Sequence, residues 1–203
     1  MTTRDVTIES YNRFAGKFAT KFDRIGTRKD DIDRVFGLIA KANPKVVELG
    51  CGNGRDAKYI LTKTEDYLGM DASSGLTNIA KEKTGHNKFV ISDFDKFNFP
   101  ENVDVIFAFA SLLHADKQTF KNILKRASKS LNKKGLFYIS LKYKINYSEE
   151  LQKDEYGVRC FYYYSIEDVK DFAGQQYKTI WSRIGEHGGQ QWMDVLLQKS
   201  NRI

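Results

Sequence analysis

A loop with three glycines at alternate positions constrains this chain more than any other feature. Residues 46–56 read VVELGCGNGRD, so a short apolar segment carries an acid, Glu48, and then breaks at Gly50, Gly52 and Gly54. Glycine tolerates positive φ and lacks the Cβ that would keep a ligand away from the backbone. A helix that follows such a loop presents unpaired N–H groups. The run therefore predicts a strand, a ligand-binding turn and a helix, in that order.

The spacing of the glycines distinguishes two kinds of cofactor. A dinucleotide-binding loop reads G-x-G-x-x-G, whereas residues 50–54 give G-x-G-x-G. The carboxylate of Glu48 would repel a pyrophosphate, and it suits a ligand that carries a cationic amine. A second acid, Asp71, ends the next apolar segment. The two acids and the loop predict a nucleoside-binding pocket at the carboxyl edge of a parallel sheet.

This pattern resembles motif I of the class I S-adenosylmethionine-dependent methyltransferases. The resemblance implies that Glu48 lies near the methionine end of the cofactor and that the loop backbone approaches the ligand. It also implies that Asp71 accepts hydrogen bonds from both ribose hydroxyls. The cofactor contacts that it implies for this part of the chain are Glu48, Gly50, Cys51, Gly52, Asn53, Gly54, Asp71 and Ala72.

Two later segments resemble the same family in the same order. Residues 89–94 form an apolar segment that ends in Asp93 and Phe94, and the resemblance implies that these two residues contact the adenine. Residues 103–114 resemble the fourth strand and motif IV, where the chain passes under the sulfonium and Ala108 is implied as a cofactor contact.

The resemblance weakens toward the C-terminus. It is clear over residues 44–142, where the segment 131–142 looks like the turn and fifth strand that follow motif IV. The stretches 157–164 and 192–197 look like small bacterial members of the family. Nucleic-acid amine methylases of this fold often carry Asn-Pro-Pro-Tyr or Asp-Pro-Pro-Tyr after the fourth strand. Residues 108–111 read AFAS instead, which disfavours that chemistry.

Composition narrows the class of protein further. A chain of 203 residues has the length of one domain with a sizeable core. No apolar run approaches the ~20 residues of a membrane span, and the first residues do not resemble a secretory signal. Two cysteines are too few for a disulfide framework, and no His/Cys cluster has metal-ligand spacing. We therefore expect a cytoplasmic protein without a metal.

The formal charge of +7 is compatible with an RNA partner. The lysines are scattered over the expected helix faces, however, and no dense basic tract with interleaved aromatic residues is present. This distribution favours a solvated basic surface. We expect a small-molecule substrate, no membrane association and a monomer or homodimer.

Periodicity predicts a single α/β domain over residues 1–203. Residues 1–43 are expected to form a helical lid, 44–142 a cofactor-binding core, and 143–203 a substrate-side loop and a closing hairpin. The expected helices are 5–24, 30–42, 54–63, 74–83, 116–131 and 166–173, and the expected strands are 45–49, 66–70, 88–92, 103–109, 135–141, 177–184 and 191–198.

Helical crossovers between strands imply a parallel sheet, whereas the last two strands form an antiparallel hairpin. The expected fold is thus a Rossmann-like, seven-stranded, mostly parallel sheet with helices on both faces and a C-terminal antiparallel hairpin. Residues 143–164 are the least regular part of the chain and polar, and we interpret them as a substrate-side loop or flap.

His114 is the strongest candidate for a catalytic residue, because it follows motif IV, where the substrate approaches in this family. A neutral imidazole could take a proton from an attacking amine or hydroxyl. Capping of the next helix, or packing against Leu112, explains this histidine equally well. Tyr11 belongs to the first helical stripe, where it could pack in the core or close the cofactor pocket near the sulfonium. The expected substrate contacts are Ser111, Lys142, Arg159 and Tyr163.

These observations predict an S-adenosylmethionine-dependent methyltransferase that acts on an oxygen or nitrogen atom of a small molecule. Three alternatives stay open: an RNA or protein methyltransferase of the same fold, a nicotinamide-dependent oxidoreductase, and a non-catalytic S-adenosylmethionine-binding module. The glycine spacing disfavours the oxidoreductase. The sequence does not distinguish the enzyme from the binding module.

Overall fold

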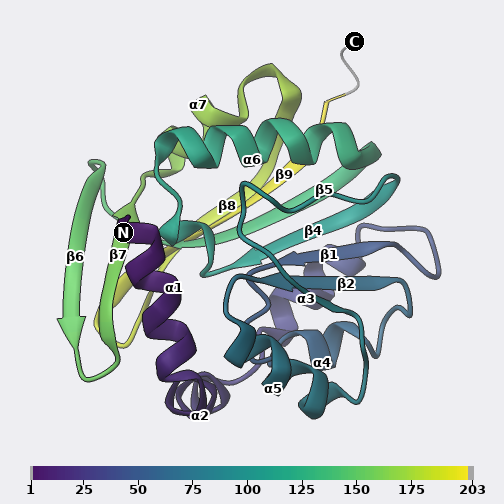
Figure 1. The fold of residues 1–203 in the computed structure, drawn as a ribbon. Coiled ribbons are helices and arrows are strands. Elements are labelled where there is room, and N and C mark those ends of the chain that lie inside the picture. The colour runs from purple at the N-terminus through teal and green to yellow at the C-terminus, as the bar shows by residue number, and fades with distance from the viewer. Residues whose placement is uncertain (1, 201–203) are drawn as a thin grey trace.

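A seven-stranded sheet forms the centre of the protein (Figure 1), and the computed structural model describes residues 2–200. Its strands are β1 (Val46–Leu49), β2 (Tyr67–Asp71), β3 (Phe89–Ile91), β4 (Val103–Phe109), β5 (Leu131–Lys142), β8 (Tyr177–His187) and β9 (Gln190–Lys199). In space they follow the order β3-β2-β1-β4-β5-β9-β8. Strands β1 to β5 pair in parallel, and β9 is antiparallel to both β5 and β8. The fold predicted from the sequence is confirmed.

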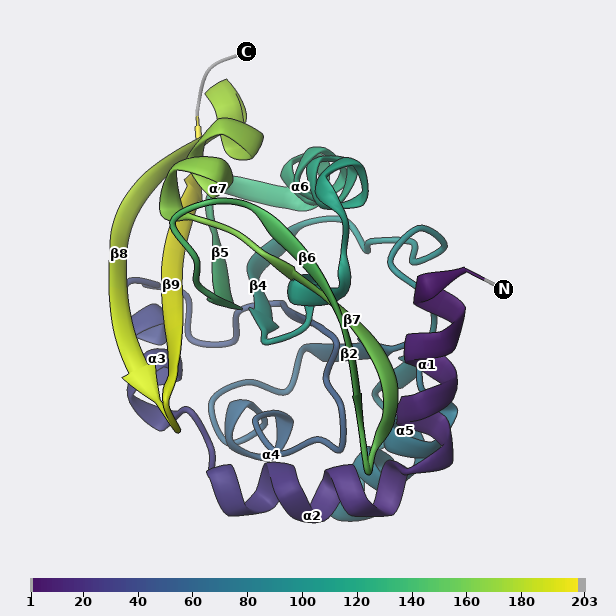
Figure 2. The same cartoon turned by 90° about the vertical axis from the view of Figure 1, so that its left-hand side faces the viewer.

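Helices cover both faces of this sheet, and a separate two-stranded hairpin stands beside it (Figures 1 and 2). The helices are α1 (Thr3–Arg13), α2 (Ala15–Ile25), α3 (Lys29–Phe36), α4 (Ala57–Ile60), α5 (Ser74–Thr84), α6 (Lys117–Ser130) and α7 (Ile166–Ala173), with the 3₁₀ turns η1 (Leu112–His114) and η2 (Gly174–Gln176). The hairpin consists of β6 (Ser148–Asp154) and β7 (Gly157–Tyr163).

The alternation of side chains along the strands divides the core into two layers. On β4, Val105 and Phe107 pack with α3 and α4. Ile106 and Ala108 point the other way and pack with the buried face of α6. All four side chains are fully buried. Both faces of the strands are therefore covered, which is why β4 reads as an almost continuous apolar run.

The first predicted helix, 5–24, is wrong in one respect, because it consists of two helices. Phe14 separates α1 from α2 with φ −112° and ψ 25°, outside the helical region. The break lets α1 run along β7 while α2 turns beneath the sheet edge (Figure 2). Two further helices are shorter than predicted: 30–42 reduces to α3, and 54–63 reduces to the single turn α4.

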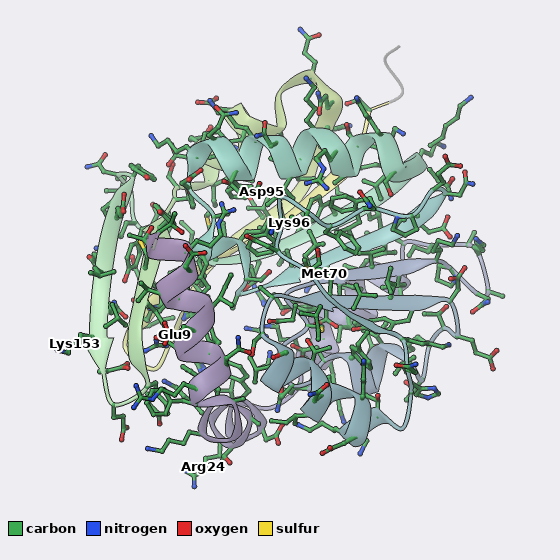
Figure 3. All side chains as sticks on the ribbon, in the orientation of Figure 1. Glu9, Arg24, Met70, Asp95, Lys96 and Lys153 are labelled. Carbon is green, nitrogen blue, oxygen red and sulfur yellow. The ribbon has the colours of Figure 1, made fainter. Side chains whose placement is uncertain are left out.

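The prediction of an irregular loop at 143–164 is also wrong, since most of this segment forms the regular antiparallel hairpin β6–β7. Hydrogen bonds with α1 hold the hairpin in its position. The Ser10 hydroxyl donates to the Val158 carbonyl (2.8 Å) and accepts from the Val158 N–H (3.0 Å). The Thr7 hydroxyl accepts from the Cys160 N–H (3.0 Å). Figure 3 labels Glu9 on α1 and Lys153 on the outer strand β6, with α1 drawn next to the hairpin that it contacts through β7.

Candidate active site

The carboxyl ends of the parallel strands face α1, α2 and β7 across a cavity of about 730 Å³. This is the sheet edge at which the sequence predicts a nucleoside pocket. The cavity brings together most of the residues predicted for the site: Tyr11, Glu48, Gly50, Cys51, Gly52, Asn53, Asp71, Ala72, Asp93, Phe94, Ser111, His114, Lys142 and Arg159. Three predicted residues, Gly54, Ala108 and Tyr163, are not part of its lining.

All three glycines of the loop have positive φ, between +54° and +74°. A Cβ on Gly50 would lie 2.3 Å from the Ser111 Cβ, and one on Gly54 would lie 3.0 Å from Ala80. These two glycines therefore allow other parts of the protein to approach the loop closely. A Cβ on Gly52 would meet nothing closer than Phe22 at 3.7 Å, so Gly52 leaves space on the cavity side. The missing side chain therefore permits close packing at Gly50 and Gly54, and it leaves space in the cavity at Gly52.

Asp71 is fixed at the end of β2 by backbone donors. Its Oδ2 accepts from the Gly52 N–H and its Oδ1 from the Ser73 N–H, both at 2.8 Å. Burial raises the pKa of Asp71, and these hydrogen bonds oppose the rise. Each carboxylate oxygen has a second lone pair, so the group can still accept hydrogen bonds from a ligand.

Glu48 is a buried acid in the wall of the cavity, with 2% of its surface exposed. It accepts a hydrogen bond from the Tyr67 hydroxyl (2.6 Å). Burial raises the pKa of Glu48 well above its usual range, and the nearby negative charge of Asp56 adds to the effect. Asp56 is itself paired with Arg28 (3.1 Å) and Arg55. A cationic ligand group in this part of the cavity would favour ionisation of Glu48.

Asn53 and Cys51 complete the loop in different ways. The Asn53 amide donates to the Ala19 carbonyl (3.1 Å) and to Asp23 (2.9 Å), so it ties α2 to the loop. The Cys51 thiol is buried, and burial raises its pKa well above its usual value. A thiol of this kind is unreactive and fills space.

Arg4 is a site residue that the sequence reasoning missed. It extends from α1 to Asp93 (3.4 Å), pairs with Asp95 and donates to the Thr119 hydroxyl (2.6 Å). Asp93 also accepts from the backbone N–H of Phe94 (2.6 Å). Arg4 therefore fastens α1 over the residues predicted to contact adenine. No local sequence signal reveals this contact, because 89 positions separate Arg4 from Asp93.

Tyr11 and His114 form a hydrogen-bonded pair at the cavity wall. The two side chains meet at 2.8 Å between the Tyr11 hydroxyl and His114 Nε2, and His114 Nδ1 lies 2.6 Å from the Cys160 carbonyl. A carbonyl only accepts, so Nδ1 carries the proton and Nε2 accepts from Tyr11. Burial lowers the pKa of His114 to about 4 and raises that of Tyr11 to about 12. The imidazole is therefore neutral near pH 7.

Asp116 occupies the capping role that the sequence left open for His114. Its carboxylate accepts from the Thr119 N–H (2.7 Å) at the start of α6. His114 instead stacks at an angle on Phe161, with 4.9 Å between the ring centroids. The position of His114 in the cavity wall thus comes from β7 and α1 and not from the helix that follows it.

Of the predicted substrate contacts, Lys142 and Arg159 lie beside Phe161. The Lys142 ammonium is 3.8 Å from the Phe161 ring centroid, and Arg159 Cζ is 5.3 Å from the same point. The Ser111 hydroxyl donates to the Leu49 carbonyl (2.5 Å). Tyr163 lies outside the cavity lining, where its hydroxyl accepts from the Gln152 amide (3.1 Å).

Two features are absent from the part of the chain that the structure describes. Residues 2–200 contain no group of three or more His, Cys, Asp or Glu side chains placed to hold a metal ion. They also contain no helix with the length and apolar character needed to cross a membrane.

The strand order, the glycine turn after β1 and the acid at the end of β2 define a class I methyltransferase fold. Residues 46–135 match the sequence family described as a methyltransferase domain. The fold is also that of solved S-adenosylmethionine-dependent methyltransferases, as the resemblance in the sequence predicts.

Proteins that are similar in sequence or in structure are also named as methyltransferases. The chain is 28% identical over 99 residues to an uncharacterised methyltransferase of Anoxybacillus flavithermus, a match over 48% of this chain and 47% of that one. It is 27% identical over 138 residues to a demethylmenaquinone methyltransferase of Thermotoga maritima, over 58% of each chain. The chain thus spans about half the length of these curated relatives. The structure of magnesium protoporphyrin IX methyltransferase from Synechocystis PCC 6803, solved with bound S-adenosylmethionine, superposes with a TM-score of 0.73 at 13% identity and covers 98% of both chains.

Proposed function

We propose that the protein binds S-adenosylmethionine and transfers its methyl group to an oxygen or nitrogen atom of a small molecule. One observation carries the proposal: a single cavity is lined by Asp71 and the glycine loop, which we call its first end, and by His114 and Lys142, which we call its second end. A cofactor bound at the first end would leave the second end for the methyl acceptor. Two of the similar proteins are named for small-molecule acceptors, a demethylmenaquinone and a magnesium protoporphyrin.

The residues at the first end fit this cofactor. Asp71 retains acceptor capacity for ribose hydroxyls, and the space beside Gly52 lets a ligand approach the backbone. Glu48 lies where a cationic amine would favour its ionised form. Asp93 and the Phe94 ring line the same cavity, which suits an adenine. Two cations of the cavity lining, Arg28 and Arg55, are already paired with Asp56 and are not free to neutralise a pyrophosphate. These features favour an adenosyl cation over a dinucleotide.

S-adenosylmethionine, when bound, would supply a methyl group on a positively charged sulfur. The chain then has to position the acceptor atom, exclude water and receive a proton. Transfer of this methyl group to the acceptor atom would release the hydrogen of that atom as a proton. His114 Nε2 is the atom that would receive it, after the Tyr11 hydroxyl moves from its place. An imidazole with a pKa of about 4 is a weak base, and it suffices for an oxygen acceptor because a freshly alkylated hydroxyl is a strong acid.

Binding of the cofactor is tested by Asp71→Ala, with Asp66→Ala as the matched control at the opposite end of β2. We expect Asp71→Ala to weaken binding of S-adenosylmethionine and S-adenosylhomocysteine at least about tenfold, since two hydrogen bonds to a charged group are lost. Asp66→Ala should leave both affinities unchanged. Titration calorimetry measures the affinities, and circular dichroism checks that both variants are folded. Equal affinity of Asp71→Ala and the unmodified protein would remove Asp71 from the site.

The alternative functions predicted from the sequence are separated from methyl transfer by binding and turnover experiments. A non-catalytic binding module would show the same cofactor affinities without turnover on any acceptor. A nicotinamide-dependent oxidoreductase would bind NADH in the same calorimetric experiment. A cytoplasmic location, and a monomer or homodimer, stay predictions from the sequence.

A further inference from the structure

Two basic side chains from separate elements meet at one buried aromatic ring. Lys142 ends the sheet strand β5, and Arg159 belongs to the hairpin strand β7. The Lys142 ammonium and Arg159 Cζ lie within 5.3 Å of the Phe161 ring centroid, and both residues line the cavity. Because β5 and β7 belong to different sheets, the convergence of two positive charges here calls for a physical explanation.

The two charges are compensated unequally. Arg159 pairs with Asp154, yet its buried Nε has no hydrogen-bond partner among the described residues. Within residues 2–200, the Lys142 ammonium makes no ion pair and no hydrogen bond, whereas the ammonium of Lys144 pairs with Glu150. Burial lowers the pKa of Lys142, and the positive charge of Arg159 adds to the effect. A half-buried ammonium beside another cation, without a counterion, is unfavourable in the free protein.

We propose that Lys142, supported by Arg159, binds a carboxylate of the methyl acceptor. Asp154 pairs with Arg159, so of the two cations at the Phe161 ring only the Lys142 ammonium has no ion-pair partner among residues 2–200, and Lys21 adds a positive charge nearby. One uncompensated ammonium at the ring matches one carboxylate. The inference depends on the proposed methyl transfer only in calling this ligand the acceptor.

The acceptor also carries an aromatic ring. Trp192, paired with Lys142 across β5 and β9, lines the cavity together with Phe161 and Tyr11. These rings supply apolar aromatic surface against which a flat group could pack. A small aromatic monocarboxylate bound there would place its ring beside His114, which lies 4.9 Å from Phe161 between ring centroids. A hydroxyl or amine on that ring would then lie within reach of the proposed proton acceptor.

The proposal is tested by comparing 4-hydroxybenzoate with 4-hydroxybenzamide, two probes of the same shape that differ in charge. Titration calorimetry is run on the full chain, with and without S-adenosylhomocysteine. We expect the carboxylate to bind at least tenfold more tightly than the amide. Lys142→Met, which keeps the length of the side chain and removes its charge, should abolish this preference. Lys144→Met is the matched control, because it removes a charge two positions away that Glu150 already compensates, and it should retain the preference.

Three results would overturn the proposal: equal affinity for the two probes, no measurable binding of either, or an unchanged preference in Lys142→Met. A third probe, phenyl phosphate, examines the charge of the ligand, and tighter binding of this dianion than of 4-hydroxybenzoate would contradict the choice of a monocarboxylate. Failure of the proposed function is a separate result. It would appear as no binding of S-adenosylhomocysteine, while the charge preference remains measurable in the protein without that ligand.

Discussion

The two ends of the cavity are built by different means. At the cofactor end, the loop after β1 and the ends of β2 and β3 supply backbone donors, glycines and acids that lie near one another in the sequence. At the acceptor end, α1, η1 and the hairpin β6–β7 meet through side chains that are far apart in the sequence: 103 positions separate Tyr11 from His114, and 148 separate Ser10 from Val158. The first end is fixed by the sheet. At the second end the sheet supplies Lys142 and Trp192, and contacts among α1, η1 and the hairpin position the other side chains.

This difference separates two kinds of sensitivity to mutation. A change at the cofactor end acts through the backbone of the sheet edge, and it should affect stability and cofactor affinity together. A change at the acceptor end loosens α1 against β7, and it should affect the geometry around His114 with a smaller effect on the fold.

The strongest test of the rigid end compares Gly50→Ala with Gly85→Ala. Both glycines have φ +71°, so the backbone strain of the new residue is about 1–2 kcal/mol at each position. Only Gly50 would place its Cβ 2.3 Å from another atom, the Ser111 Cβ, whereas Gly85 has nothing within 4 Å. We expect Gly50→Ala to lower the free energy of unfolding by about 3–5 kcal/mol, because overpacking adds to the strain.

Urea denaturation of both variants measures this difference. Equal losses of stability would show that φ alone makes glycine necessary at position 50, and that the close approach to Ser111 relaxes at little cost. That result would also make the cofactor end as adaptable as the acceptor end.

The same division explains what could be predicted from the sequence. Glu48, Asp71 and the loop glycines lie within one strand–turn–helix unit and its neighbour, and local chemistry fixes such units. The strand order followed from helical crossovers and one hairpin. Gly54, by contrast, has the expected positive φ but packs on Ala80 outside the cavity lining, and spacing alone does not distinguish these two uses of a glycine.

The acceptor end could not be predicted in the same way. Strand β6 is polar and mostly exposed, so its sequence carries no alternation that indicates a strand. Its partner β7 is also held by hydrogen bonds with Thr7 and Ser10, which belong to another part of the chain. The ion pair from Arg4 to Asp93 is likewise a tertiary contact between residues without a shared motif.

A second test exploits the buried imidazole at the acceptor end. The pKa of His114 falls from 6.5 to about 4 on folding, because burial disfavours the charged form. Between these two values the unfolded chain binds a proton that the folded protein does not, so stability falls as the pH is lowered from about 6.5 to about 4. The full contribution is on the order of 3 kcal/mol. Above pH 6.5 this group contributes no pH dependence.

Unfolding free energies of the unmodified protein and of His114→Gln at pH 7 and pH 4.5 isolate the contribution of His114. Glutamine does not titrate in this range, so the variant should lose less stability on acidification. Identical pH dependence in the two proteins would mean that the cavity admits enough water to keep His114 near its ordinary pKa. The acceptor end would then be open and not closed by α1.

The smallest expected effect concerns the contact between α1 and the hairpin. Ser10→Ala removes one hydroxyl that both donates to and accepts from Val158. Ser148→Ala on β6 is the matched control, because the Ser148 hydroxyl is buried without a hydrogen-bond partner among residues 2–200. We expect Ser10→Ala to lower the free energy of unfolding by about 1–2 kcal/mol, and Ser148→Ala to leave it unchanged or slightly raised.

The informative comparison in Ser10→Ala is between the loss of methyl-transfer rate and the loss of affinity for S-adenosylhomocysteine. If β7 positions His114 through the Cys160 carbonyl, loosening β7 should reduce methyl transfer severalfold while the affinity for S-adenosylhomocysteine changes little. A parallel loss of affinity and turnover would show that α1 and the hairpin hold the cofactor as firmly as they hold the acceptor. The two ends of the cavity would then respond to mutation together. The contacts of α1 would support the hairpin directly, and they would support the glycine loop through α2, which Asn53 ties to the loop.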